Sequence, residues 1–259
     1  MEQKFAICRV AIAPLRATAS DKSEITTQLL FGDAVEVLET ADPWYRIKSA
    51  YDDYEGWMDF KQLAFVSAEE YGRCLTAQAL VPAAVNNTVI GEDGSLYHLP
   101  ASSVLPNYAD GYCQIGKHRF EVLFEPHEIP SVSGENILQL ASFFQNAPYL
   151  WGGRTIFGID CSGFVQSVFK LAGIAMQRDA WQQAEQGETV NFLPEVQAGD
   201  IAFFDNVEGR IIHVGIMLNN SQIIHASGRV RIDPVDDQGI YNHELERYSH
   251  QLRIIKRII

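Results

Sequence analysis

The pattern of the 259-residue chain changes near Pro130, and this change constrains the fold more than any single motif. Before it, short stretches that alternate apolar and polar residues lie between turns, as in Val35 to Glu39, and this is typical of all-β structure. After it, residues 134–146 and 161–172 carry apolar residues at steps of three and four, which predicts two amphipathic helices. Antiparallel strands are expected to follow. The chain is therefore predicted to be all-β first and α+β afterwards.

Two β-rich segments are predicted ahead of Pro130, over residues 1–66 and 78–125. A short helix or linker is expected between them, at residues 68–77. In the second segment, Gly91-Glu92-Asp93-Gly94 predicts a hairpin turn. Residues 125–130 are expected to link these segments to a last domain over residues 130–259.

Charge and cysteine usage exclude several classes of protein. The formal net charge is −13 and no run of Lys or Arg occurs, which argues against nucleic acid or an anionic membrane surface as a partner.

No stretch reaches the ~18 apolar residues of a membrane span. The N-terminus does not resemble a signal peptide, so the expected location is cytoplasmic, or periplasmic or secreted if a leader has been removed. The four cysteines show no C-x-x-C spacing and predict neither a disulfide framework nor a zinc finger.

Cys161 is the candidate nucleophile. A glycine-containing turn leads into Asp160-Cys161-Ser162-Gly163, and helical periodicity begins there, so Cys161 is expected in the first turn of a helix. The free N–H groups and the dipole at a helix N-terminus stabilise a thiolate and are expected to lower the thiol pKa.

A cysteine nucleophile needs a base, and the base needs an orienting partner. Of the seven histidines, His213 and His225 fall on predicted core strands that the turn Asn219-Asn220-Ser221 joins. Adjacent antiparallel strands can bring the two imidazoles into hydrogen-bond reach. A satisfied core histidine is the ordinary explanation for one such residue. Two on one hairpin, together with a helix-start cysteine, favour catalysis.

Several motifs of the last domain occur in a specific order. They are Trp151-Gly152-Gly153, Gly158-Ile159-Asp160-Cys161-Ser162-Gly163-Phe164-Val165, Gly199-Asp200-Ile201, His213-Val214-Gly215-Ile216 and His225-Ala226-Ser227. Together they resemble the NlpC family of papain-like cell-wall cysteine peptidases. The resemblance implies Cys161 as nucleophile, His213 as general base and His225 as the residue that orients the imidazole. It also implies that the Tyr149 hydroxyl forms an oxyanion site with the Cys161 backbone N–H. No cofactor and no metal are implied.

The β-rich part has a resemblance of its own. The order of its elements resembles the bacterial SH3-like domains attached to cell-wall enzymes: Pro14-Leu15-Arg16, then Gln28 to Asp33, Trp44 to Ile47 and Gly56-Trp57. The fold implied for the chain is multidomain. Two small all-β SH3-like barrels, at 1–66 and 78–125, precede an α+β papain-like cysteine peptidase domain at 130–259.

The barrels and Gln177-Arg178-Asp179-Ala180 narrow the resemblance to the γ-D-glutamyl-L-diamino acid endopeptidases, the dipeptidyl-peptidase VI branch. The branch usually has Ser where Ala180 stands, so one hydrogen bond to the substrate is expected to be missing. The substrate implied is a free muropeptide stem with an N-terminal L-Ala, cut in cell-wall recycling. Its third residue is diaminopimelate or Lys. No nucleic acid and no membrane partner are implied.

The same resemblance assigns substrate-binding residues. Asp179 binds the free α-amine, with Asp160 and Ser162 lining the subsite. A helix N-cap is the ordinary role for Asp160, and both roles could hold. The first barrel closes the pocket with Tyr54. The family's barrel glutamate has no counterpart here, because Thr26-Thr27 stands at its place; Glu24 is the nearest acid, and Glu55 could substitute. Trp151 is either pocket wall or core.

Three other functions remain as alternatives. An amidase or acyltransferase with the same papain-like arrangement shares the Cys-His-His chemistry. A non-catalytic muropeptide-binding module is disfavoured by the intact set of Cys161, His213 and His225. A zinc site made of these three residues is disfavoured because no close ligand pair accompanies them.

Overall fold

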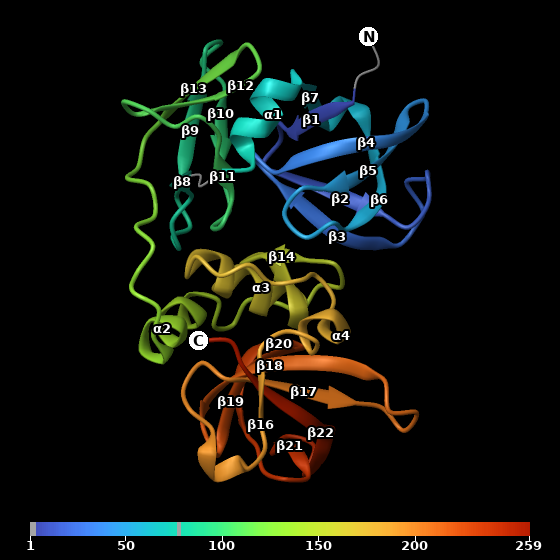
Figure 1. Ribbon diagram of the computed structural model, residues 1–259, viewed down its shortest axis with the longest axis vertical. Helices are drawn as coiled ribbons and strands as arrows, with labels where there is room; N and C mark the ends of the chain where they lie inside the picture. Colours follow the sequence, from blue (N-terminus) through green and yellow to red (C-terminus); the bar gives the residue numbers. More distant parts are fainter. Residues whose placement is uncertain (1–3, 77–78) are drawn as a thin grey trace. The chain divides into compact units, whose positions relative to one another are not determined.

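The computed structural model describes residues 4–76 and 79–259, and the chain falls into two compact units, Met1–Glu128 and Ile129–Ile259 (Figure 1). The first β-rich segment is predicted to begin at Met1, the linker to end at Ala77 and the second β-rich segment to begin at Gln78. These three residues lie outside the described residues. None of the helices in the described ranges is long and apolar enough to cross a membrane.

The first sheet of unit 1 contains the strands predicted for the start of the chain. Its strand order is β3-β2-β6-β5-β4-β1-β7. The strands are β1 Phe5–Cys8, β2 Ile12–Arg16, β3 Ile25–Leu30, β4 Ala34–Ala41, β5 Trp44–Ser49, β6 Glu55–Asp59 and β7 Leu63–Phe65. Alternate residues point into one core, so Leu15, Ile47 and Met58 are fully buried. Strand β6 pairs with β2, and Gly56 lies close to Leu15 there. A side chain is disfavoured at this position because its Cβ would lie 2.6 Å from the Leu15 side chain.

The second part of unit 1 follows helix α1 (Ala68–Cys74), which falls within the predicted helix or linker. Its strands are β8 Ala79–Leu80, β9 Thr88–Gly91, β10 Leu96–His98, β11 Val104–Leu105, β12 Tyr112–Ile115 and β13 His118–Val122. Strands β9 and β10 form the predicted hairpin. Buried residues of this part, such as Val89 and Cys113, share one cluster with Ile7 and Phe31 of the first part. The shared core makes unit 1 compact; a separate second barrel stays a prediction.

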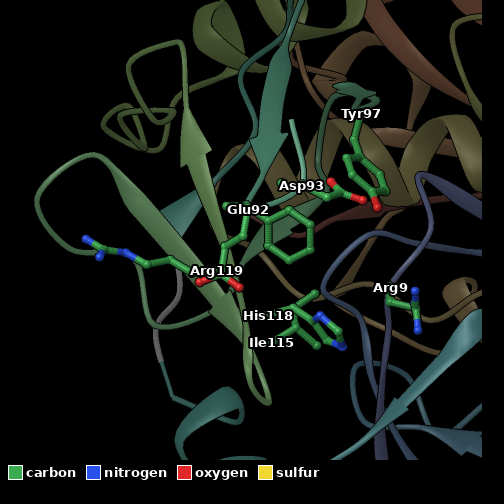
Figure 2. Close-up of a pocket in the computed structure, with 9 residues that line it drawn as sticks. Arg9, Glu92, Asp93, Tyr97, Ile115, His118 and Arg119 are labelled. Carbon is green, nitrogen blue, oxygen red and sulfur yellow. The ribbon is translucent and has the colours of Figure 1, made fainter. Parts of the chain in front are cut away.

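A cavity of about 300 Å³ in unit 1 is lined mainly by residues of the second part, together with Arg9 from the turn between β1 and β2 (Figure 2). The buried side chains of Ile115 and Phe120 contribute to its wall, and its charged lining residues have both signs. Figure 2 shows the Asp93 carboxylate beside the Tyr97 ring, whereas Arg119 extends away from them. The barrel residues expected to contact substrate do not line this cavity.

Unit 2 is the predicted combination of helices and an antiparallel sheet. Its elements are α2 Gly134–Phe143, β14 Arg154–Thr155, β15 Gly158–Ile159, α3 Cys161–Leu171, α4 Ala180–Gln183, β16 Glu188–Val190, β17 Ile201–Asp205, β18 Ile211–Asn219, β19 Gln222–Ser227, β20 Arg229–Pro234, β21 Gly239–Asn242 and β22 Arg247–Arg257. The sheet order is β16-β22-β17-β18-β19-β20, and β21 pairs with β22. Strand β22 has no counterpart in the sequence prediction.

Helix α3 is central to unit 2. It contacts β18 and β19, and α2, α3 and α4 lie on one side of the sheet in Figure 1. Every residue of α3 is buried, including the polar Gln166 and Ser167. The hairpin β18–β19 turns at the predicted Asn219-Asn220-Ser221. Because α3 packs against this hairpin, the first residue of the helix has a fixed position relative to strands β18 and β19.

Candidate active site

Cys161 is the first residue of α3, as the sequence predicts. The Asp160 side chain caps the helix by accepting the Gly163 N–H at 2.6 Å, and its other oxygen accepts the Gly152 N–H at 2.9 Å. The loop before α3 packs closely against the start of the helix because residue 163 is glycine. A Cβ on Gly163 would lie 2.3 Å from the Gly153 carbonyl oxygen. The N-cap role considered for Asp160 is therefore confirmed.

The environment of the thiol differs from the expected one. Burial raises the pKa of Cys161 to about 12, and the charge of Asp160 acts in the same direction. The charge of Arg178 and the backbone N–H groups of Ser162 and Val214 lower it only in part. The expected fall in the Cys161 pKa was wrong, because loss of water outweighs the helix terminus. The resting sulfur is a thiol that a base must deprotonate.

The structure brings His213 and His225 together. His213 Nε2 lies 2.8 Å from His225 Nδ1, and both rings are buried. In the sheet, Gly215 of β18 is the direct partner of His225 in β19. Val214, whose N–H acts on the Cys161 sulfur, follows His213 directly. The nucleophile and the imidazole pair therefore belong to one cluster.

His250 is a member of this cluster that the sequence did not point to. Its ring stacks on His213 with ring centroids 4.0 Å apart. Burial, followed by the positive charges that His225 and His250 would carry, lowers the pKa of His213 well below 6.5. Burial also lowers the pKa of His250 to about 4. His213 is thus a neutral imidazole near pH 7, the form that accepts a proton.

Asp233 of β20 is a second residue that sequence reasoning missed. His225 Nε2 lies 2.9 Å from Asp233 Oδ2, and the carboxylate also pairs with Arg231, whose Nε is 2.7 Å from Oδ2. Burial opposes ionisation of Asp233, but the hydrogen bonds from His225 and Arg231 outweigh it and lower its pKa. The strand pattern could have revealed Asp233. If the chain turns at Gly228, Arg231 of the following strand pairs with His225, and Asp233 lies two residues further on the same face of the sheet.

Tyr149 lies near the nucleophile. Its pKa is raised to about 12, first by burial and then by the negative charges that Cys161 and Asp160 would carry. The hydroxyl therefore stays protonated and remains a hydrogen-bond donor. The backbone is fixed by the Tyr149 N–H, which donates to the Gly228 carbonyl at 3.0 Å. The side chain is 36% exposed, so it is not a core aromatic.

Arg178 holds together two residues expected at the amine subsite. Its Nη2 lies 2.6 Å from Asp160 Oδ2, and its Nη1 donates to Ser162 Oγ at 2.8 Å and to Asp160 Oδ1 at 3.1 Å. All three side chains are buried. Each oxygen of Asp160 accepts both from Arg178 and from a backbone N–H, so this carboxylate is satisfied within the protein.

The other expected residues of unit 2 are more accessible. Asp179 is half-buried at the start of α4, and its N–H donates to Gln182 Oε1 at 3.1 Å. Trp151 is 60% exposed, which excludes the core alternative for its side chain. Within the described ranges, no three His, Cys, Asp or Glu side chains are grouped so that they could hold a metal ion.

Three expected substrate contacts belong to unit 1. Tyr54 directly precedes β6 and packs against the core of the first sheet. Glu55 lies 2.6 Å from Arg46 Nη2 in an exposed ion pair, and Glu24 is exposed. Their part in the site stays a prediction.

A buried cysteine at a helix start, beside an imidazole pair on an antiparallel hairpin, defines unit 2 as a candidate cysteine hydrolase. Residues 146–248 match the NlpC/P60 family, and residues 15–63 match the bacterial dipeptidyl-peptidase Sh3 domain. A γ-D-glutamyl-L-lysine dipeptidyl-peptidase of Bacillus subtilis is 35% identical over 78% of this chain and 72% of its own. The chain belongs to the NlpC/P60 family and is a cysteine peptidase.

Two further relatives agree with this membership. A γ-D-glutamyl-L-lysine dipeptidyl-peptidase of Bacillus cereus is 26% identical over 91% of this chain and 77% of its own. The crystal structure of an NlpC/P60 family protein from Bacillus cereus superposes with a TM-score of 0.81. It covers 98% of this chain and 99% of its own at 19% identity, and so supports the fold.

Proposed function

We propose that this peptidase hydrolyses the γ-D-Glu–diamino acid bond of free murein stem peptides, L-Ala-γ-D-Glu-diaminopimelate or L-Ala-γ-D-Glu-Lys. The observation that carries the chemistry is the cluster of Cys161 with the paired imidazoles of His213 and His225. The substrate class is supported by two relatives named for γ-D-glutamyl-L-lysine peptides, which resemble this chain over both units.

The proposed reaction begins with proton transfer from the Cys161 thiol to His213. The sulfur attacks the γ-carbonyl carbon of D-Glu, forming the C–S bond. The resulting oxyanion is stabilised by the Tyr149 hydroxyl and the Cys161 backbone N–H, and one such donor contributes ~3 kcal/mol to catalysis. Collapse breaks the C–N bond, and the leaving amine takes the proton from His213. A water molecule, deprotonated by His213, then attacks the thioester carbonyl. The C–S bond breaks, the dipeptide leaves with a free carboxylate, and His213 returns the proton to the Cys161 sulfur.

Recognition of the free α-amine is assigned chiefly to Asp179. An ammonium group that leaves water requires a carboxylate partner. Asp160 already balances the charge of Arg178, and it positions the subsite together with Ser162. Trp151 forms part of the pocket wall, and Tyr54 closes the pocket from the barrel. Glu24 and Glu55 stay alternatives for the contact that the barrel glutamate makes in the family.

The test uses the free tripeptide and its N-acetylated form as substrates for the full chain. Mass spectrometry should find L-Ala-γ-D-Glu and the free diamino acid from the free tripeptide only. The Cys161→Ala variant should cleave neither peptide. Cleavage at another bond, or equal rates on the acetylated peptide, would contradict the proposed specificity. Diaminopimelate and Lys tripeptides compared in parallel decide the third residue.

We also place this activity in the recycling of stem peptides. The net charge of −13 favours small free peptides over a polyanionic wall. Incubation with intact sacculi should release no peptide, and release at the rate seen with free tripeptide would contradict the recycling role. The cytoplasmic location stays a prediction.

A further inference from the structure

A continuous line of hydrogen-bonding groups leads from the proposed base to a buried ion pair. His213 Nε2 meets His225 Nδ1 at 2.8 Å, and His225 Nε2 meets Asp233 Oδ2 at 2.9 Å. The three side chains lie on the neighbouring strands β18, β19 and β20 and are at most 5% exposed. At this depth water does not compete for these hydrogen bonds, so their donors and acceptors must match.

The carboxylate sets the direction of every hydrogen bond in the line. An ionised carboxylate only accepts, and Arg231 keeps Asp233 ionised through contacts to both oxygens, at 2.7 and 2.9 Å. His225 Nε2 must therefore carry the hydrogen. In the neutral ring, His225 Nδ1 is then an acceptor, and His213 Nε2 must donate to it.

The consequence falls on the remaining nitrogen of His213. With the hydrogen held on Nε2, the neutral ring has its lone pair on Nδ1, the nitrogen nearer the backbone. The next residue, Val214, is the one whose N–H acts on the Cys161 sulfur. Only the tautomer with Nδ1 free of hydrogen can take the thiol proton.

We propose that Asp233 is a positioning residue that acts through His225 to hold His213 in the tautomer with Nδ1 ready for the Cys161 proton. This role rests on the proposed function, since it serves the same attack on a peptide carbonyl. When the thiol proton moves to Nδ1, His213 becomes an imidazolium whose Nε2–H remains bonded to His225. Asp233 stays ionised throughout and balances the new charge, and the proton later leaves with the amine.

Asn at this position is the informative substitution. It keeps the shape of Asp233 but adds N–H donors and removes the charge. Arg231 and His225 both present hydrogens to the site, so neither orientation of the amide can accept them all. If the amide donates to His225 Nε2, both imidazoles reverse and His213 presents Nδ1–H to the sulfur.

The experiment measures histidine tautomers and kinetics in the full chain. Nitrogen-15 NMR of the wild type should show Nε2–H tautomers for His213 and His225. Asp233→Asn should lower kcat about 10- to 100-fold with little change in KM, and should alter the His213 nitrogen shifts. Asp233→Glu, which keeps the carboxylate, should restore part of kcat. Asp237→Asn, the same change at an exposed acid, should match the wild type.

The pH profile separates positioning from a merely structural role. The ionisable groups around His213 are His225, His250, Cys161, Asp233 and Arg231. Removing the single carboxylate among them disfavours the imidazolium, so the acid limb of kcat/KM should move to lower pH in Asp233→Asn. A folded Asp233→Asn variant with wild-type kcat and pH profile would overturn the proposal. A wild-type His213 carrying its hydrogen on Nδ1 would also overturn it, even if the variant does not fold.

Failure of the proposed substrate can be told apart from failure of this role. If the wild type cleaves no stem tripeptide, the tautomer measurement still applies. Alkylation of Cys161 by iodoacetamide, followed by peptide mapping, then replaces kcat and should be about tenfold slower in Asp233→Asn. Equal alkylation rates at every pH would count against Asp233, whatever the substrate.

Discussion

At the residue scale, Asp160 shows how one side chain can serve structure and site together. It caps α3, accepts a loop N–H and forms a buried ion pair with Arg178. Sequence reasoning placed Asp160 in the lining of the amine subsite and offered the cap as a role that could hold as well. Nothing in the local pattern showed that an arginine 18 residues later would pair with its carboxylate. The negative charge of Asp160 is therefore balanced by Arg178 before any substrate binds.

The first residue-scale prediction concerns this ion pair. Asp160→Asn leaves the buried Arg178 guanidinium without a counter-charge, which should lower the free energy of unfolding by about 3–5 kcal/mol. Urea unfolding of the full chain measures the change. The exposed Asp237→Asn should stay within about 0.5 kcal/mol of the wild type. A stable Asp160→Asn protein would show that Arg178 finds another partner.

The second residue-scale prediction concerns pH. A protonated His213 cannot accept the thiol proton, so activity is lost as pH falls through its pKa. Because burial and the neighbouring imidazoles hold this pKa well below 6.5, the acid limb of kcat/KM should lie below pH 6.5. Initial rates in buffers from pH 4 to pH 8 provide the measurement. An acid limb above pH 6.5 would indicate that His213 is ionised in the resting enzyme.

At the scale of elements, the start of α3 could be predicted because its determinants are local. An N-cap acid, a glycine pair and apolar periodicity are all readable in one stretch. Strand β22 could not be predicted, because it pairs with β16 and β17, and Thr189 and Lys256 are partners only in the folded sheet. Its residue His250 joins the site for the same reason, and so does Asp233 through the pairing of β19 with β20.

The prediction at this scale uses the glycine at the start of α3. Gly163→Ala would place a Cβ 2.3 Å from the Gly153 carbonyl, so the loop must move away from the helix that carries Cys161. We expect kcat to fall about tenfold or more and stability to drop by about 1–3 kcal/mol. Gly72→Ala in α1 meets nothing within 4 Å and should be neutral or stabilising. Wild-type kcat in Gly163→Ala would show that the helix start tolerates this shift.

At the scale of the whole molecule, residues 15–63 of unit 1 match the bacterial dipeptidyl-peptidase Sh3 domain. If Tyr54 closes the pocket as proposed, Tyr54→Ala should raise KM for the free tripeptide about tenfold, which equals 1.4 kcal/mol of binding. The preference over the N-acetylated peptide should shrink in parallel. Tyr54→Phe keeps the ring and serves as the control. Unchanged KM in Tyr54→Ala would remove the barrel from substrate recognition.

The sequence by itself determined the β-rich first part, the α+β second part, the helix-start cysteine and the histidine hairpin. These follow from periodicities and caps that a few neighbouring residues specify. Only the tertiary structure decided the electrostatics. Burial raises the pKa of Cys161 instead of lowering it, Arg178 neutralises Asp160, and Asp233 lies behind His225. The physical reason is that desolvation and charge pairing depend on residues distant in sequence, which no local pattern contains.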